Sequence, residues 1–158
     1  PLVVDPVMVS SSGARLLELD AVDSLVSRLF PLATVVTPNL AEAEALVGEG
    51  TKRDLAWRVH ELGASADIVT GGHGEPVDHL FDGERHVEIP VARHDVRATH
   101  GAGCTHSATL AALLAQGLAL EDAARGAAAA ATRAVSQGLE GLGAGDGPVD
   151  VIGLQGAA

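Results

Sequence analysis

The sequence predicts an α/β protein with a mostly parallel central sheet and helices on both of its faces. Short apolar runs alternate with segments whose apolar residues recur at helical spacing, which is typical of parallel strands joined by helices. One segment differs, because polar and apolar residues alternate on both sides of Asp82-Gly83 and indicate a β-hairpin. A chain of 158 residues is long enough to form one domain, and we expect residues 1–158 to belong to one.

The elements of the first half follow from their apolar pattern and from the residues that bound them. Residues 2–7 and 33–38 read as buried strands, and Pro38 ends the second. Three helices are expected, each after a residue suited to an N-cap: 20–30 with Asp20, 39–48 with Asn39, and 51–63 with Thr51. Gly48 and Gly63 are suited to end the last two helices.

The second half adds a strand, a hairpin and two helices. Residues 67–72 read as a third strand that ends in glycines, and residues 77–89 as the hairpin. Residues 104–117 and 120–138 read as helices, and the alanine run 127–131 is expected to pack closely on a neighbour. The glycine-rich tail after them reads as loop.

Composition excludes several classes of protein. The net charge is −11, with 21 acidic and 10 basic residues, which argues against a nucleic-acid-binding protein. No run of 18 apolar residues exists, so no membrane span is expected. The single cysteine rules out an internal disulfide and suits the cytoplasm. Because the chain opens without Met on an apolar run, we expect it to be the C-terminal portion of a longer protein.

Polar residues follow each predicted parallel strand. The carboxyl ends of such strands meet at one edge of a sheet, where ligands bind. The three loops carry Asp5 with Val7 and Met8, then Thr37 with Asn39 and Glu42, then Thr70 with Gly71, Gly72 and His73. Asn39 and Glu42 share a face of the first helical turn, where Glu42 can hold Mg²⁺ or can close a capping box with Asn39.

The stretch HGAGCT holds the only cysteine, Cys104. Gly101, Ala102 and Gly103 leave the backbone bare before a helix, so free N–H groups and the helix dipole can form an anion site. A thiol in the first helical turn lies at the positive end of the helix dipole, so Cys104 can act as a base or a nucleophile. The alternative is a tight turn followed by a small core residue.

Three other kinds of site are less well supported by the sequence. The only lysine, Lys52, follows Thr51 and does not complete a P-loop motif, so a phosphate site must be built from backbone groups. The seven histidines form no zinc-binding pair, and most read as surface or loop residues. His100 and His106 flank Cys104, which raises a Cys–His hydrolase, although no oriented acid partner is evident.

Four stretches together, 3–17, 37–48, 69–74 and 100–117, resemble the hydroxymethylpyrimidine/phosphomethylpyrimidine kinases of thiamin biosynthesis. These kinases belong to the ribokinase-like superfamily, so the resemblance implies a three-layer α/β/α fold whose N-terminal part is missing here. It implies ATP-dependent phosphorylation of a hydroxymethylpyrimidine and its monophosphate, with Mg²⁺ as cofactor. It also implies a cytoplasmic enzyme that often forms a homodimer, without nucleic-acid or membrane partners.

The resemblance also implies a role for each matching residue. The anion hole would be Gly101, Ala102 and Gly103, with Cys104 as the base that takes the proton of the substrate hydroxymethyl group. The remaining roles would be metal binding by Asp5 and Glu42, substrate contact by Val7, and nucleotide contact by Thr37, Asn39, Thr70 and Gly72.

Two departures from the family pattern bear on activity. Thr70 stands where these kinases typically have lysine, so the phosphates would lose a cation. The family's N-terminal half supplies much of the substrate pocket, so we expect the isolated 158-residue chain to be poorly active or inactive. A pyridoxal-type kinase, a Cys-dependent hydrolase and a non-catalytic pyrimidine-binding module stay open as alternatives.

Overall fold

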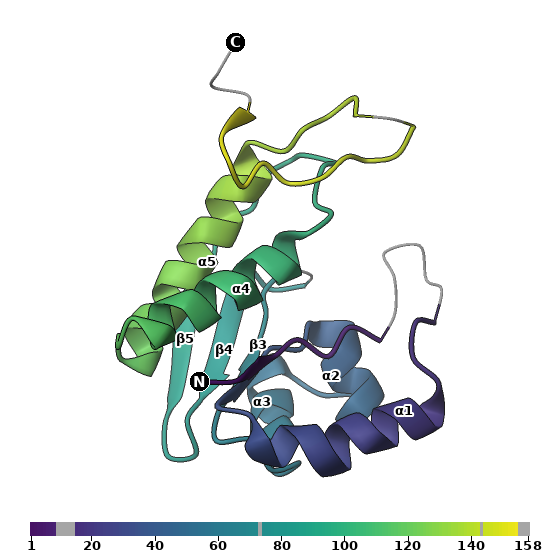
Figure 1. Cartoon of the computed structure of the whole chain (residues 1–158), viewed down its shortest axis with the longest axis vertical. Coiled ribbons are helices and arrows are strands. Elements are labelled where there is room, and N and C mark those ends of the chain that lie inside the picture. The colour runs from purple at the N-terminus through teal and green to yellow at the C-terminus, as the bar shows by residue number, and fades with distance from the viewer. Residues whose placement is uncertain (9–14, 73, 143, 155–158) are drawn as a thin grey trace. The chain divides into compact units, whose positions relative to one another are not determined.

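The computed structural model describes residues 1–8, 15–72, 74–142 and 144–154. The chain packs as two compact units, Pro1–Pro90 and Val91–Ala158. The first unit holds the sheet and the second holds two long helices (Figure 1). Among the described residues, no helix combines the length and apolar character needed to cross a membrane.

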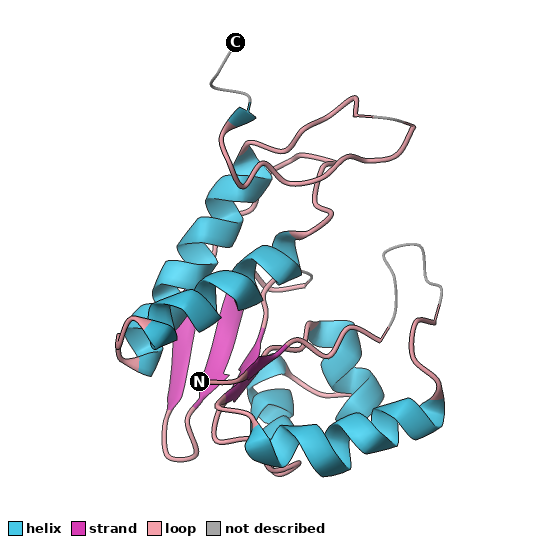
Figure 2. Ribbon diagram, viewed as in Figure 1, coloured by secondary structure: helices cyan, strands magenta, loops and turns pink. Residues whose placement is uncertain are grey.

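The sheet of the first unit has five strands in the order β1-β2-β3-β4-β5. The strands are β1 (Val3–Val4), β2 (Val35–Val36), β3 (Asp67–Val69), β4 (Val77–Phe81) and β5 (His86–Pro90). The first three run parallel, whereas β4 and β5 form the expected hairpin and pair antiparallel, with β4 against β3 (Figure 2). The hairpin thus extends the parallel sheet, and the carboxyl ends of β1, β2 and β3 share one edge.

The first unit has three α-helices, α1 (Leu19–Ser24), α2 (Leu40–Val47) and α3 (Lys52–His60), and α1 continues into η1 (Leu25–Leu29) and η2 (Phe30–Leu32). Residues of α2, α3, η1 and η2 pack against the sheet, whereas α1 has no buried residue. Val4 and Val36 form one core cluster with residues of η1, η2 and α2, and Val69 and Phe81 form another with α2 and α3. Both crossovers lie on the same face because β1, β2 and β3 advance in one direction and such crossovers are right-handed.

The caps at Asn39, Gly48 and Thr51 are confirmed, whereas two predicted caps are wrong. Gly63 does not end α3, because the helix ends at His60 and Glu61 is its C-cap residue. Asn39 and Thr51 cap α2 and α3 with their side chains, and Gly48 ends α2 with a φ of 80°. Asp20 was wrong as an N-cap, because α1 begins at Leu19 after Glu18, which makes no side-chain cap bond. Asp20 lies instead in the first turn, where its negative charge interacts favourably with the positive end of the helix dipole.

Element lengths differ from the predicted ones. The predicted strands 2–7 and 33–38 pair only over two residues each, as β1 and β2, because Pro6 and Pro38 bring no N–H donor to a ladder. The predicted helix 20–30 changes its winding to π and then to 3-10, with Pro31 in the final turn. The apolar spacing indicated a helix but not this change of pitch.

The second unit is a pair of packed helices, α4 (Ala102–Ala115) and α5 (Leu120–Ser136). The described alanines on the buried side of α5 are Ala123, Ala124, Ala127, Ala128 and Ala134. A Cβ added at Gly126 would lie 2.6 Å from Leu113 Cδ1, so this side chain of α4 packs directly over Gly126. The predicted close packing of the alanine run is confirmed.

Candidate functional site

The loops that follow β1, β2 and β3 are joined at the carboxyl edge of the sheet. The N–H of Thr37 donates to the carbonyl oxygen of Val4 at 2.9 Å, which ties the end of β2 to β1. Thr70 N–H donates to the Pro38 carbonyl at 3.0 Å, and Asn39 and Thr70 form a parallel bridge. The structure therefore brings together the polar residues that the sequence placed at separate strand ends.

Glu42 and Asn39 form a complete capping box at the start of α2. Asn39 Oδ1 accepts from the Glu42 N–H at 3.0 Å, and Glu42 Oε2 accepts from the Asn39 N–H at 2.9 Å. The capping interpretation of this pair is confirmed. The capping box holds the Glu42 carboxylate at the carboxyl edge of the sheet, and only 5% of Glu42 is exposed.

Asp5 lies close enough to Glu42 to act on its charge. Burial raises the pKa of Glu42, and the Asp5 carboxylate raises it further, whereas N–H groups of Asn39 and Met8 oppose the rise. Two neighbouring carboxylates that repel each other suit a divalent cation, and Mg²⁺ is commonly held by one or two carboxylates together with substrate phosphates. Within the described ranges, no group of three or more acidic, His or Cys residues could hold a metal by itself.

The loop after β3 is held close to the start of β4. The Gly71 N–H donates to Asp78 Oδ1, which is buried. A Cβ added at Gly71 would lie 2.7 Å from the Val77 nitrogen, so only glycine allows this approach of two backbone segments. At Gly72, in contrast, no heavy atom of the described residues beyond its chain neighbours lies within 4 Å of the place a Cβ would take. The loop is therefore fixed at Gly71 and open at Gly72.

The remaining first-unit candidates differ in exposure. Val7 is 40% exposed, as a residue that contacts a ligand can be. Thr37 is only 3% exposed, and its hydroxyl donates to the Val4 carbonyl at 3.5 Å, so it stabilises the sheet edge. Its predicted contact with a nucleotide stays a prediction. His73 and residues 9–14 of the family-like stretches lie outside the described residues.

In the second unit, the stretch HGAGCT forms the entry to α4. Gly101 is the N-cap residue with a φ of 90°, a conformation that favours glycine. α4 begins at Ala102, two residues earlier than predicted, so the N–H groups of Gly103 and Cys104 have no acceptor within the helix. This is the geometry of an anion site.

Cys104 is exposed on the first turn of α4. The interpretation of Cys104 as a small core residue was therefore wrong. A chain of backbone contacts holds this turn in place, since Val149 N–H donates to the His100 carbonyl at 2.9 Å and Asp150 N–H to the Ala134 carbonyl at 3.0 Å. A pocket of about 390 Å³ in this unit is lined in part by Thr105, the residue after Cys104.

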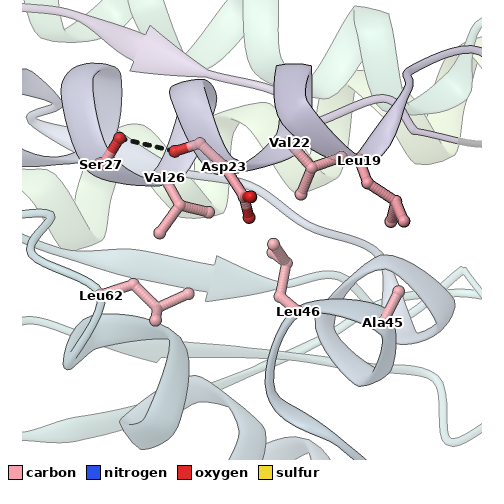
Figure 3. Close-up of a pocket in the computed structure, with 8 residues that line it drawn as sticks. All are labelled: Leu19, Val22, Asp23, Val26, Ser27, Ala45, Leu46 and Leu62. Carbon is pink, nitrogen blue, oxygen red and sulfur yellow. Dashed lines mark hydrogen bonds between the residues drawn. The ribbon is translucent and has the colours of Figure 1, made fainter.

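The first unit also has a pocket of about 500 Å³ between the α1–η1 segment and α2 (Figure 3). Its polar groups are few, and Ser27 Oγ already donates to the Asp23 carbonyl at 2.6 Å. The lining residues are Leu19, Val22, Asp23, Val26, Ser27, Ala45, Leu46 and Leu62. None of them is a predicted site residue, so this pocket is not the predicted ligand-binding or catalytic site.

Sequence reasoning missed residues whose surroundings depend on tertiary packing. Lys52 and Asp78 are both buried beside the loop after β3. The sequence indicates only that Lys52 does not complete a P-loop motif, and it gives no role to Asp78. His79 and His106 are buried, unlike the other described histidines, which are exposed or half-buried as expected for most of them. No pattern in the sequence marks these four residues, because each belongs to an element predicted for other reasons.

Comparison with known proteins gives one family. The family model described as phosphomethylpyrimidine kinase matches residues 1–150. A hydroxymethylpyrimidine/phosphomethylpyrimidine kinase of Rhizobium meliloti is 46% identical over 93% of this chain, and this match covers 59% of that protein. A thiamine biosynthesis bifunctional protein, ThiED, of Geobacter sulfurreducens is 44% identical over 96% of the chain and is covered over 32% of its length.

A solved structure confirms the α/β, ribokinase-like fold class. The ADP complex of Bacillus subtilis pyridoxal kinase superposes with a TM-score of 0.82 at 34% sequence identity. The match covers 97% of this chain and 59% of the pyridoxal kinase chain. The chain therefore spans less than two thirds of the length of each of these three proteins.

Proposed function

Because the chain belongs to the phosphomethylpyrimidine kinase family, we propose that the intact protein is an ATP-dependent kinase of thiamin biosynthesis. Its substrates would be 4-amino-5-hydroxymethyl-2-methylpyrimidine and the monophosphate of that compound. The observation that carries the proposal is the capping box that fixes the buried Glu42 carboxylate, with Asp5 close enough to act on its charge, at the edge where three strand-end loops meet. Such an edge is where open α/β sheets bind ligands.

The chemistry requires little covalent work from the protein. In phosphoryl transfer, catalysis consists of positioning and of charge stabilisation. The backbone of Gly101, Ala102 and Gly103 would donate hydrogen bonds to the transferred phosphoryl group, and the exposed Cys104 would take the proton of the substrate hydroxyl. The hydroxyl oxygen then bonds to the γ-phosphorus of ATP while the bond to the β-phosphate oxygen breaks, which leaves ADP.

The first unit would hold the nucleotide side of the reaction. Thr70 and Gly72 would contact the phosphates from the loop after β3. Thr37 and Asn39 would contact the nucleotide from the neighbouring loop, where Asn39 bridges to Thr70. Asp5 and Glu42 would hold Mg²⁺, which supplies charge neutralisation for the phosphates when bound. The exposed Val7 would contact the pyrimidine ring. We also infer that both units belong to one kinase domain and that the enzyme is cytoplasmic.

Parallel assays of the intact protein with the hydroxymethylpyrimidine and with pyridoxal test the proposal. We expect ATP-dependent phosphorylation of the pyrimidine, with a higher kcat/KM than for pyridoxal. The similarity to pyridoxal kinase makes a pyridoxal-type kinase the second candidate, and a reversed ratio would establish it. A Cys-dependent hydrolase would form a covalent acyl-enzyme without ATP, and a binding module would bind the pyrimidine without turnover.

Replacing Glu42 by Gln is expected to raise the Mg²⁺ concentration needed for half-maximal activity by roughly 10- to 100-fold. Glutamine keeps an oxygen that can accept from the Asn39 N–H, so the capping box and α2 should persist while the charge is lost. Magnesium titration of the initial rate measures the effect. Glu44→Gln on the same helix is the matched control and should leave the titration unchanged. An unaltered magnesium requirement in Glu42→Gln would exclude Glu42 as a metal ligand.

A further inference from the structure

The loop between β3 and β4 is fixed from below by a buried lysine. Lys52 is the first residue of α3 and is 6% exposed, although it is the only lysine of the chain. Its Nζ donates to the carbonyl oxygen of Glu75 and, at 3.4 Å, to that of Val77. A lysine is seldom buried, because its ammonium group loses water that few protein groups replace. Here carbonyl groups of this loop replace part of that water.

Asp78 holds the same loop at its other end. Its Oδ1 accepts from the Gly71 N–H, at the point where the Gly71 and Val77 backbones approach closely. The Val77 N–H in turn donates to the Glu75 carbonyl at 2.8 Å. Carbonyl groups at the end of the loop thus face the ammonium group, and an amide at its start faces a carboxylate. The two anchors have opposite charge and act on opposite ends of one short segment.

Gly72 lies between the two anchors. Among the described residues other than its chain neighbours, no heavy atom lies within 4 Å of the place that a Cβ on Gly72 would take. A loop whose base is tied by buried charged groups while the Cα of Gly72 stays open is suited to hold a ligand with its backbone. Preorganisation of this kind lowers the conformational entropy lost when the ligand binds.

We propose that Lys52 and Asp78 are positioning residues that hold residues 70–72 and 74–77, the described part of the loop after β3, in the conformation that binds the phosphates of the nucleotide. The inference rests on the proposed function, in that it takes this loop as the phosphate loop. Neither side chain need touch the nucleotide. Lys52 orients the carbonyl groups at the end of the loop, and Asp78 orients the Gly71 amide at its beginning.

Two single variants separate positioning from a simple effect of charge. Lys52→Met removes a positive charge and Asp78→Ala a negative one, in intact protein. If both residues position the loop, both variants weaken ADP binding, and we expect at least a roughly 10-fold higher Kd by calorimetry. An effect of charge alone would act in opposite directions, so that Asp78→Ala would bind ADP more tightly. The KM for the pyrimidine should stay within about twofold of wild type.

Two further variants complete the experiment. Lys52→Arg keeps a cation with several donors and should recover part of the ADP affinity. Arg53→Met removes the neighbouring exposed cation on α3 and should leave ADP binding unchanged. If Lys52→Met fails to fold, Lys52→Arg and Asp78→Ala still decide the question through the same Kd. Wild-type ADP affinity in a folded Lys52→Met protein, or tighter binding in Asp78→Ala, would overturn the proposal.

ADP binding is measured without turnover, so the outcome is independent of the pyrimidine assay. A protein that binds ADP but phosphorylates no pyrimidine would refute the proposed function and still test the two anchors. A protein that phosphorylates the pyrimidine with unchanged ADP affinity in both variants would refute the anchors and leave the proposed function standing.

Discussion

Cys104→Ala in the intact protein is expected to lower kcat by about 10²- to 10⁴-fold, the range that a general base contributes. ADP affinity should stay at the wild-type value, because the proposed nucleotide contacts come from other residues. Stability should also be unchanged, since Cys104 is exposed and its removal leaves no cavity. Single-turnover kinetics, ADP calorimetry and a thermal melt measure these three quantities.

Cys104→Asp sharpens the same experiment. An aspartate carboxylate can also act as a general base, so this variant should recover part of the lost rate. A nucleophilic thiol would behave differently, because the carboxylate would not replace its covalent chemistry. A wild-type kcat in Cys104→Ala would remove Cys104 from the mechanism.

The second large effect concerns Asp67 at the start of β3. The residue is 0% exposed, and neither carboxylate oxygen has a hydrogen-bond partner among the described residues. The nearest basic atom, His60 Nδ1, lies 3.9 Å from Oδ2, beyond hydrogen-bond distance. Burial raises the pKa of Asp67 to about 9. The folded protein therefore keeps this carboxyl group protonated at neutral pH.

This raised pKa makes stability depend on pH. The unfolded chain releases the Asp67 proton near pH 4, whereas the folded chain keeps it until about pH 9. In that window the folded state binds more protons, so the contribution of Asp67 is largest below pH 4 and is lost as the pH rises toward 9. The unfolding free energy should fall by up to about 1.4 kcal/mol per pH unit from this group.

Urea unfolding of wild type and Asp67→Asn at several pH values between 5 and 8 measures the contribution of Asp67 as a difference of slopes. We expect the free energy of unfolding of Asp67→Asn, relative to that of wild type, to increase as the pH rises. Asp82→Asn is the control, because backbone N–H groups of Arg85 and Glu84 lower the pKa of Asp82 and its contribution changes only at acid pH. Parallel slopes for wild type and Asp67→Asn would show that Asp67 is ionised in the folded protein.

The features that could be predicted from the sequence are those that local chemistry determines. Asn39 and Glu42 are three residues apart, so their reciprocal cap needs only one turn of helix. Asp82-Gly83 sets a hairpin because the turn itself demands such residues, and β4 and β5 pair around it. The strand-end residues met at one edge because parallel strands leave no other arrangement.

The features that could not be predicted depend on residues distant in sequence. The burial of Lys52 follows from the position of α3 beside a loop 23 residues later. The burial of Asp67 follows from its central strand, and an acidic residue at a strand start reads equally well as exposed. The widened turn of η1 has no local marker, because Leu25–Leu29 has the same apolar spacing as an ordinary helix.

The hairpin β4–β5 has a consequence for the tolerance of this protein to mutation. Asp78 reaches Gly71 while the next residue, His79, stands opposite Val69 of β3, and a slip of β4 by one residue would turn the Asp78 carboxylate to the other face of the sheet. The pairing of Asp78 with Ile89 of β5 helps to hold β4 in place. The turn at Asp82-Gly83 sets that register from the far end of the hairpin. Substitutions in a surface turn that touches no ligand can therefore change nucleotide affinity, and a screen for affinity mutants should include this turn.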